Sequence, residues 1–254
     1  MVKNIKLKIA YDGTGYHGWQ TQPGKNTIQG TIEEAIYTVM KEMKQKINLT
    51  VSGRTDSGVH ALGQIANFIS DTNIPQDKIK IALNANLPND IRILESEIVP
   101  MEFNSRFDAH DKTYMYQIYN DRVLSPFYSR YSCFVPSRLD FDKMEESLKC
   151  IIGSHDFKGF MATGSDVKTT VRTIYEAKLI YERPIIKLYI TGSGFLYNMV
   201  RIIAGTLIDI GKGIKGSECM EEAIKTKDRT ALGQTAVSRG LFLISVNYKK
   251  MLDM

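Results

Sequence analysis

The sequence predicts an α+β protein that is built from two halves. Segments with the period-two hydrophobicity of strands are mixed with segments of helical periodicity, but without the regular βαβ order of a parallel sheet. The series of elements ends near residues 100–111 and then begins again. With 254 residues, the chain is long enough for two domains of ordinary size. We therefore expect an N-terminal half at 1–105 and a C-terminal half at 106–254.

The first half opens with a strand over 4–13, because Ile5, Leu7 and Ile9 alternate with lysines. A helix follows after a polar loop, since apolar residues recur at helical spacing over 28–43. The remaining elements expected in this half are short strands at 49–51 and 65–69, a short helix over 74–88 and a strand over 91–99.

The second half begins with a tyrosine-rich strand over 112–120 and a helix over 142–152. Residues 173–192 predict two strands that are joined by a turn at Arg183 and Pro184. The chain is completed by a long amphipathic helix over 199–210, a shorter helix and a strand over 240–248.

Composition limits the partners and the environment of the protein. The formal net charge is +5, which fits a polyanionic partner. The three cysteines are far apart and form neither a CxxC pair nor a disulfide framework, which favours a reducing, cytoplasmic location. The four histidines are also scattered, so we expect no metal site. We expect no signal peptide, because the N-terminal residues lack a long apolar region, and no stretch approaches the roughly 20 apolar residues of a membrane span.

Residues 13–18, GTGYHG, fit the glycine pattern of a dinucleotide-binding loop and follow a strand. Such a loop must open into a helix whose N-terminus receives the pyrophosphate, but residues 19–23 intervene here. The similar pattern at 211–216, GKGIKG, follows a helix instead of a strand. We interpret both as turn glycines and expect no dinucleotide cofactor, which leaves an oxidoreductase as the weaker alternative.

Residues 52–60, SGRTDSGVH, place one carboxylate, Asp56, on a connection between two predicted strands. Small and hydroxyl-bearing residues surround it, and scaffolds often present functional groups on such loops. One interpretation is a tight turn that is held by an Asx-type hydrogen bond. The other is a catalytic carboxylate, a nucleophile or base that Arg54 keeps ionised by lowering its pKa. The residues alone leave both interpretations open.

Two side chains of the second half are further candidates. Tyr114, in the tyrosine-rich strand, suits either a packed core or a stacking surface for a nucleobase. Arg201 interrupts an otherwise apolar helix, where an unpaired charge is costly. We expect a carboxylate or phosphate partner for it, with Asp56 as a candidate; the alternative is an arginine that reaches the surface. Three histidines that lie near glycines are expected to be structural or to contact RNA: His17, His60 and His155.

Several stretches, quoted in chain order, carry a resemblance: YDGTGYHGWQTQPGKNTIQGTIEEAI, SGRTDSGVHALGQIANF, ALNANLPNDI, RFDAHDKTYMYQIYN, GSHDFKGF with VRTI, and GFLYNMVRIIAGTLIDIGKG. Together they resemble one family, the tRNA pseudouridine synthases of the TruA type. The stretches occur in the family's order and span nearly the whole chain.

The resemblance implies a mixed, mostly antiparallel sheet that runs through two similar α/β halves, with helices on one face and a central active-site cleft. It implies that Asp56 is the catalytic aspartate, that Tyr114 packs against the target uracil, and that Arg54 contacts the flipped nucleotide or makes room for it. Arg201 matches the arginine that pairs with the catalytic aspartate. The family's usual substrate is tRNA, at uridines 38 to 40 of the anticodon stem-loop, and a homodimer binds it. The reaction oxidises nothing, so the resemblance implies neither a cofactor nor a metal.

The chain departs from the family pattern at three places. Asn104 and Ser105 stand where histidine and alanine are common, and Ser57 stands where alanine is frequent. The C-terminal stretch TAVSRGLFL differs from the frequent TAPAxGLYL. None of these changes removes a proposed catalytic group. Two alternatives stay open: a paralogue with the same chemistry on another tRNA or rRNA site, and a non-catalytic RNA-binding protein.

Overall fold

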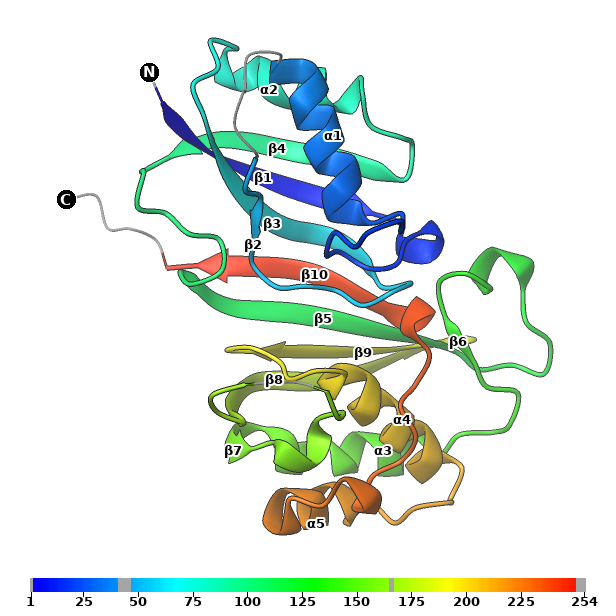
Figure 1. The fold of residues 1–254 in the computed structure, drawn as a ribbon. Helices are drawn as coiled ribbons and strands as arrows, with labels where there is room; N and C mark the ends of the chain where they lie inside the picture. Colours follow the sequence, from blue (N-terminus) through cyan, green and yellow to red (C-terminus); the bar gives the residue numbers. More distant parts are fainter. Residues whose placement is uncertain (1, 41–46, 165–166, 250–254) are drawn as a thin grey trace. The chain divides into compact units, whose positions relative to one another are not determined.

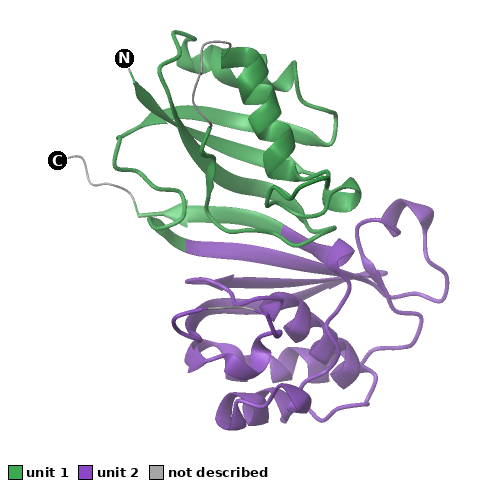
Figure 2. Cartoon of the chain, in the orientation of Figure 1, with its two compact units in different colours: residues 1–110, 243–254 green, residues 111–242 purple. Residues whose placement is uncertain are grey.

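Two units make up the structure, a computed structural model that describes residues 2–40, 47–164 and 167–249 (Figure 1). Unit 1 comprises residues 1–110 and 243–254, and unit 2 comprises residues 111–242 (Figure 2). The sequence predicts halves at 1–105 and 106–254, and in the structure most of the C-terminal strand lies in unit 1.

Unit 1 contains β1 (Lys3–Tyr11), α1 (Ile28–Met40), β2 (Thr50–Val51), β3 (His60–Ser70), α2 (Gln76–Asn84), β4 (Ile91–Val99) and most of β10 (Leu241–Tyr248). Its strand order is β4-β1-β3-β10, and β1 is antiparallel to both of its neighbours. β10 lies so close to β3 that a Cβ on Gly63 would come within 2.5 Å of the Ile244 carbonyl oxygen. Glycine at this position therefore lets the last strand of the chain return to the first unit.

The two faces of the unit 1 sheet differ as the alternation in β1 predicts. Ile5, Leu7 and Ile9 point to one face of the sheet and are fully buried. α1 and α2 cover one face of this sheet (Figure 1). On the opposite face, lysines of β1 form ion pairs with glutamates of β4, among them Lys8 with Glu95 at 2.7 Å. The Lys8 ammonium group lowers the pKa of the Glu95 carboxyl. The core thus lies between the sheet and the helices.

Unit 2 contains most of β5 (Ala109–Tyr119), together with β6 (Cys133–Phe134), α3 (Phe141–Ser147), β7 (Gly153–Asp156), β8 (Val171–Glu182), β9 (Ile185–Gly192), α4 (Met199–Gly211) and α5 (Cys219–Thr226). The strand order is β5-β9-β8-β7 with antiparallel pairs, and β6 pairs with β5 in parallel. Eleven of the 13 residues of α4 are buried, which makes it the central helix of this unit. Even so, neither α4 nor another helix in the described ranges has the length and hydrophobicity to cross a membrane.

The predicted fold class, α+β with a mostly antiparallel sheet, is confirmed. Some boundaries differ. The strand over 4–13 ends at Tyr11, because the Asp12 side chain accepts from the Thr14 N–H and starts a 3₁₀ turn. The helix over 142–152 ends at Ser147 and continues as a separate 3₁₀ turn. Residues 41–43 of the predicted first helix lie outside the described residues.

Candidate active site

The loop that carries Asp56 connects β2 to β3 in unit 1 and alternates between buried and exposed residues. Ser52, Thr55 and Val59 are buried, with 2, 7 and 2% of their surface exposed. Arg54 is exposed, and Asp56 is half-buried. The loop therefore turns anchoring residues inward and leaves the two predicted site residues accessible.

The buried amide of Gln64 holds the beginning of this loop. Its Oε1 accepts a hydrogen bond from Ser52 Oγ at 2.7 Å, and its Nε2 donates to the Gly53 carbonyl oxygen at 2.8 Å. The Gln64 side chain has no exposed surface. Because buried polar groups are costly without partners, the amide and the loop hold each other in place. Arg54 follows directly after the two anchored residues.

Thr55, the residue before Asp56, is anchored from two sides. Its hydroxyl shares a buried hydrogen bond of 2.7 Å with the Tyr11 hydroxyl, and its carbonyl oxygen accepts from the Trp19 N–H at 3.0 Å. A Cβ on Gly18 would lie 2.7 Å from that oxygen, and the φ of 85° at Gly18 also favours glycine. Burial raises the pKa of Tyr11 to about 12, so its hydroxyl is protonated at neutral pH.

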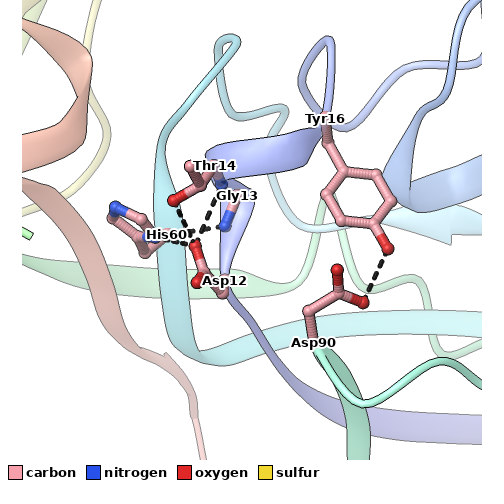
Figure 3. A network of polar contacts seen from close by, with 6 residues as sticks. All are labelled: Asp12, Gly13, Thr14, Tyr16, His60 and Asp90. Carbon is pink, nitrogen blue, oxygen red and sulfur yellow. Dashed lines mark hydrogen bonds and ion pairs between the residues drawn. The ribbon is translucent and has the colours of Figure 1, made fainter. Parts of the chain in front are cut away.

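Tyr16 fastens the side of the loop that follows Asp56. Its carbonyl oxygen accepts hydrogen bonds from Ser57 Oγ at 3.1 Å and from the Gly58 N–H at 3.4 Å. Its hydroxyl donates to Asp90 Oδ1 at 2.7 Å (Figure 3). Burial, and then the Asp90 carboxylate, raises the pKa of the Tyr16 hydroxyl, which keeps it a donor. Asp56 is thus flanked on both sides by residues that are fixed to the segment after β1.

A second group of polar contacts lies at the start of β3 (Figure 3). His60 Nδ1 is 3.1 Å from Asp12 Oδ1 and 3.1 Å from the Gly13 backbone nitrogen, which donates to it. The same Asp12 oxygen accepts from the backbone N–H and the hydroxyl of Thr14, at 3.0 and 2.6 Å. His60 is 1% exposed. Of the two roles expected for it, the structure gives His60 the structural one, since it joins the Asp56 loop to the turn after β1.

The glycines of GTGYHG are turn glycines, as predicted. Gly13–Gly15 form a 3₁₀ turn, and a Cβ on Gly13 would lie 2.0 Å from the Val59 carbonyl oxygen. The close approach ties this turn to the end of the Asp56 loop. α1 begins only at Ile28, so the glycines do not lead directly into a helix as a dinucleotide fingerprint requires.

Tyr114 lies on β5 in unit 2, opposite Ile190 of β9. It is 9% exposed, and its ring meets the Phe195 ring edge to face at a centroid distance of 5.1 Å. Two residues further along, the buried Tyr116 donates from its hydroxyl to the Val237 carbonyl oxygen at 2.8 Å. Packing therefore fixes the Tyr114 ring, and its role as a stacking surface stays a prediction.

Arg201 lies in the first turn of α4 and is held by groups of its own unit. Its Nε donates to the Ala236 carbonyl oxygen at 2.8 Å, and its Nη1 donates to Asn198 Oδ1 at 2.7 Å. Ala236 in turn donates its N–H to the Arg201 carbonyl oxygen at 3.0 Å. Arg201 is partly buried and anchored, unlike an arginine that merely reaches the surface. A carboxylate or phosphate partner for it stays a prediction.

Residues 233–237 form an irregular segment that runs closely along α4. The Gly233 N–H donates to Thr206 Oγ1 at 3.0 Å, and a Cβ on Gly205 would lie 1.8 Å from the Gln234 carbonyl oxygen. At its end, the Val237 carbonyl accepts the hydrogen bond from β5. Sequence reasoning missed this segment because backbone atoms make its contacts. Its signals in the sequence are the pair of glycines, one on each side of the contact, and the start of the stretch TAVSRGLFL at Thr235, whose contact with α4 the pattern does not show.

The four predicted site residues lie in two pairs. Arg54 and Asp56 share one loop of unit 1, and Tyr114 and Arg201 belong to unit 2. The ion pair between Asp56 and Arg201 and the cleft between the halves stay predictions. Among the described residues, no group of three or more His, Cys, Asp or Glu side chains could hold a metal ion.

Comparison with known proteins gives a consistent result. A family model described as "tRNA pseudouridine synthase" matches residues 8–108 and 148–249. These ranges include Arg54, Asp56 and Arg201, while Tyr114 lies between them. The match therefore covers the loop of unit 1 and the central helix of unit 2.

Curated relatives match over almost the whole chain. A protein of Caldicellulosiruptor bescii named "tRNA pseudouridine synthase A" is 48% identical over 97% of this chain and 100% of its own length. "tRNA pseudouridine synthase A 2" of Clostridium tetani is 48% identical over 98% of this chain and 100% of its own. A Bacillus licheniformis protein, also named "tRNA pseudouridine synthase A", is 45% identical over 96% of this chain and 98% of its own length. Among solved structures, "Crystal Structure of a Cbf5-Nop10-Gar1 Complex" matches 94% of this chain and 58% of that chain, with 12% identity and a TM-score of 0.38.

Proposed function

The chain belongs to the tRNA pseudouridine synthase family, and we propose that it isomerises uridine to pseudouridine at positions 38, 39 and 40 of the tRNA anticodon stem-loop. The observation that carries the proposal is the 48% identity, over nearly the full length of both chains, with a protein named tRNA pseudouridine synthase A. The match of the family model to parts of both units supports it.

The reaction rearranges the substrate without adding a group to it. The bond from uracil N1 to ribose C1′ breaks, the base turns, and a bond forms from C5 to C1′. N1 ends with a proton, and C5 loses one. Electrons and atoms balance within the nucleotide, so the chemistry asks for a group that acts at the sugar but for no oxidant or external donor.

Asp56 is the group that we propose for this step. Its carboxylate either attacks C1′ to form a covalent intermediate or removes the C2′ proton to give a glycal. Both routes need an ionised carboxylate that can approach the ribose closely. The loop supports this role because Thr55 and Ser57 on either side are anchored, while Asp56 itself is half-buried. A nucleophile or base that is fixed in this way reacts from one defined position.

The other site residues are proposed to prepare the nucleotide and the carboxylate. The target uridine must leave the helical stack before its glycosidic bond is accessible. The Tyr114 ring, which is already held by its contact with Phe195, would pack against the flipped uracil. The exposed Arg54 would contact the flipped nucleotide. Arg201 would pair with Asp56 and keep it ionised.

The proposed partner is tRNA, bound by a homodimer in the cytoplasm. The formal net charge of +5 supports a polyanionic partner. Contacts to phosphates position a protein without reading sequence, which would allow one site to serve three neighbouring uridines.

Replacement of the carboxylate by an amide tests the catalytic role. Because C5 loses its hydrogen, tRNA labelled with tritium at uracil C5 releases the label on each turnover. We expect Asp56→Asn to fold and to bind tRNA, but to lower the rate of tritium release by a factor of about 10³ or more. The control is Asp71→Asn, which makes the same change at an exposed carboxylate and should leave the rate unchanged.

Two results would count against the proposal. Turnover of Asp56→Asn at the wild-type rate, with contaminating enzyme excluded, would remove Asp56 from the chemistry. A folded wild-type protein that binds tRNA but releases no tritium would instead favour the alternatives, a different RNA target or a non-catalytic RNA-binding protein.

A further inference from the structure

Asn198 has a left-handed backbone conformation, which the start of a helix does not require. Among the described residues other than glycine, only Asn198 and Lys227 have positive φ angles, of 60° and 61°. Asn198 is the N-cap of α4, and its carbonyl oxygen already accepts from the Ile202 N–H at 2.9 Å. The left-handed conformation is disfavoured for residues with a Cβ, although asparagine tolerates it better than most. Such an outlier points to a local task when the surroundings impose it.

The side chain of Asn198 does not do what an N-cap asparagine ordinarily does. An N-cap side chain usually accepts a hydrogen bond from a backbone N–H of the first turn, but here no such bond forms. Instead Oδ1 accepts from Arg201 Nη1 at 2.7 Å. The capping oxygen is thus directed away from the helix backbone and onto a guanidinium group.

With this contact, the Arg201 guanidinium is held at two of its nitrogen atoms. Ala236 accepts from Nε and Asn198 accepts from Nη1, and the two acceptors come from different segments of unit 2. A guanidinium is planar, so two anchored N–H groups fix both its position and the direction of its plane. An arginine without such anchors would lose its rotamer freedom when it binds its partner, and this loss of entropy would weaken the interaction.

We propose that Asn198 is a positioning residue, which orients Arg201 for the carboxylate of the reaction. The inference rests on the proposed function, in which Arg201 pairs with Asp56. The amide suits the task because its oxygen is neutral: it orients the guanidinium without competing for its charge. An aspartate would supply the same oxygen at the same backbone angles, but it would form an ion pair with Arg201 itself.

The competing explanation is that Asn198 only stabilises the start of α4. The two explanations differ in how Asn198→Gly behaves, since glycine adopts the left-handed conformation without strain but removes the acceptor. If Asn198 positions Arg201, the variant folds with an unchanged or raised Tm. Its kcat for tritium release falls by about 10- to 100-fold, the loss of one hydrogen bond to a charged group, while KM for tRNA changes by less than about twofold.

Matched variants separate the two explanations. Lys227→Gly makes the same change at the other left-handed residue, at the end of α5, and should keep the wild-type kcat. Asn198→Asp keeps the oxygen and should fold like the wild type, yet lose kcat. In a double-mutant cycle, Asn198→Gly should have no further effect once Arg201→Ala is present, because it acts through the arginine.

The outcomes are distinguishable, with all rates expressed per folded protein. Asn198→Gly with full kcat, or an effect that is undiminished in the Arg201→Ala background, would overturn the positioning role. An active wild type whose rate is insensitive to Arg201→Ala would remove the proposed role of Arg201, and the inference with it. Absence of tritium release by the wild type would be a failure of the proposed function itself.

Discussion

At the level of single residues, Asp56 lies between two neighbours whose side chains are both engaged. Thr55 shares a hydrogen bond with Tyr11, and Ser57 donates to the Tyr16 carbonyl. An alanine in place of Ser57 would lack that bond. The serine of this chain therefore adds one anchor to a loop that backbone contacts already hold.

The first prediction concerns Tyr11. In Tyr11→Phe, the Thr55 hydroxyl loses its buried partner, so we expect the free energy of unfolding in urea to fall by about 1–3 kcal/mol. Because Asp56 follows Thr55 directly, kcat for tritium release should fall more than KM for tRNA rises. Tyr181→Phe, at an exposed tyrosine, is the control and should stay within about 0.5 kcal/mol of the wild type. Equal stability of Tyr11→Phe and the wild type would show that the bond contributes nothing.

The sequence supplied the candidate residues but few of their partners. Asp56 and Arg54 stand out because charges are rare among small residues, and Arg201 because it interrupts an apolar helix. The buried partners Gln64 and His60 could not be found in this way. Gln64 bonds to Ser52 and Gly53, and His60 Nδ1 contacts the turn after β1. No local pattern shows which separate segments will meet.

At the level of elements, the fit of α4 against residues 233–237 depends on Gly205. Alanine normally stabilises a helix interior relative to glycine by about 1 kcal/mol. Here an added Cβ would lie 1.8 Å from the Gln234 carbonyl oxygen, so the segment must move. We expect Gly205→Ala to lower the free energy of unfolding by about 1–3 kcal/mol or more. The movement should also weaken the Ala236 contact that holds Arg201, and so lower kcat.

Gly15→Ala is the control for this substitution, since a Cβ there meets nothing within 4 Å. Urea unfolding of the two variants makes the comparison. A Gly205→Ala protein that is as stable as the wild type and equally active would contradict the close packing of α4 against this segment.

The ion pair between β7 and the end of α5 should appear in the pH dependence of stability. Lys227, and then Thr170, lowers the pKa of Asp156 below the ordinary value of about 3.9, through contacts of 2.7 and 2.5 Å. A carboxyl group whose pKa is lower in the folded than in the unfolded protein stabilises the fold at pH values above its unfolded-state pKa. This stabilisation is lost as the pH falls through the folded-state pKa. We expect Asp156→Asn to be less stable than the wild type at pH 6, by at most about 1 kcal/mol for so exposed a pair.

Urea unfolding between pH 6 and pH 2 would measure how the free energy of unfolding differs between the wild type and Asp156→Asn. The difference should shrink toward zero at the acid end, where the wild-type carboxyl is also protonated. A difference that is independent of pH would show that the effect comes from the altered side chain and not from its charge.

Long elements could be predicted from the sequence, and so could the short β2, but β6 and β7 could not. β1, β4 and β8 have enough residues for a period-two pattern, and α4 has a continuous apolar surface. β6 and β7 have two and four residues, too few for any period to show. These two strands form because they pair with longer strands, β6 with β5 and β7 with β8.

At the level of the whole molecule, no sequence pattern predicts that β10 pairs with β3 of the first unit. That pairing joins β3 to the end of the chain and leaves no local signal except Gly63, where the strands approach closely.

Two departures from the family pattern also have structural roles. Ser105 is buried and donates from its hydroxyl to the Thr50 carbonyl at 2.7 Å, and Asn104 Oδ1 accepts from the backbone N–H groups of Arg106 and Phe107. These residues hold a turn of unit 1 and give no reason to change the proposed RNA target.

The most direct test of the account is to map pseudouridine, nucleotide by nucleotide, on unmodified tRNA transcripts that have been incubated with the wild-type protein or with Asp56→Asn. We predict conversion at positions 38, 39 and 40 by the wild type and at none of them by the variant. Conversion by Asp56→Asn would contradict the catalytic role of the carboxylate. Absence of conversion at these positions by a folded, tRNA-binding wild type would contradict the proposed target, and the same map on ribosomal RNA would then show whether the chemistry serves another site.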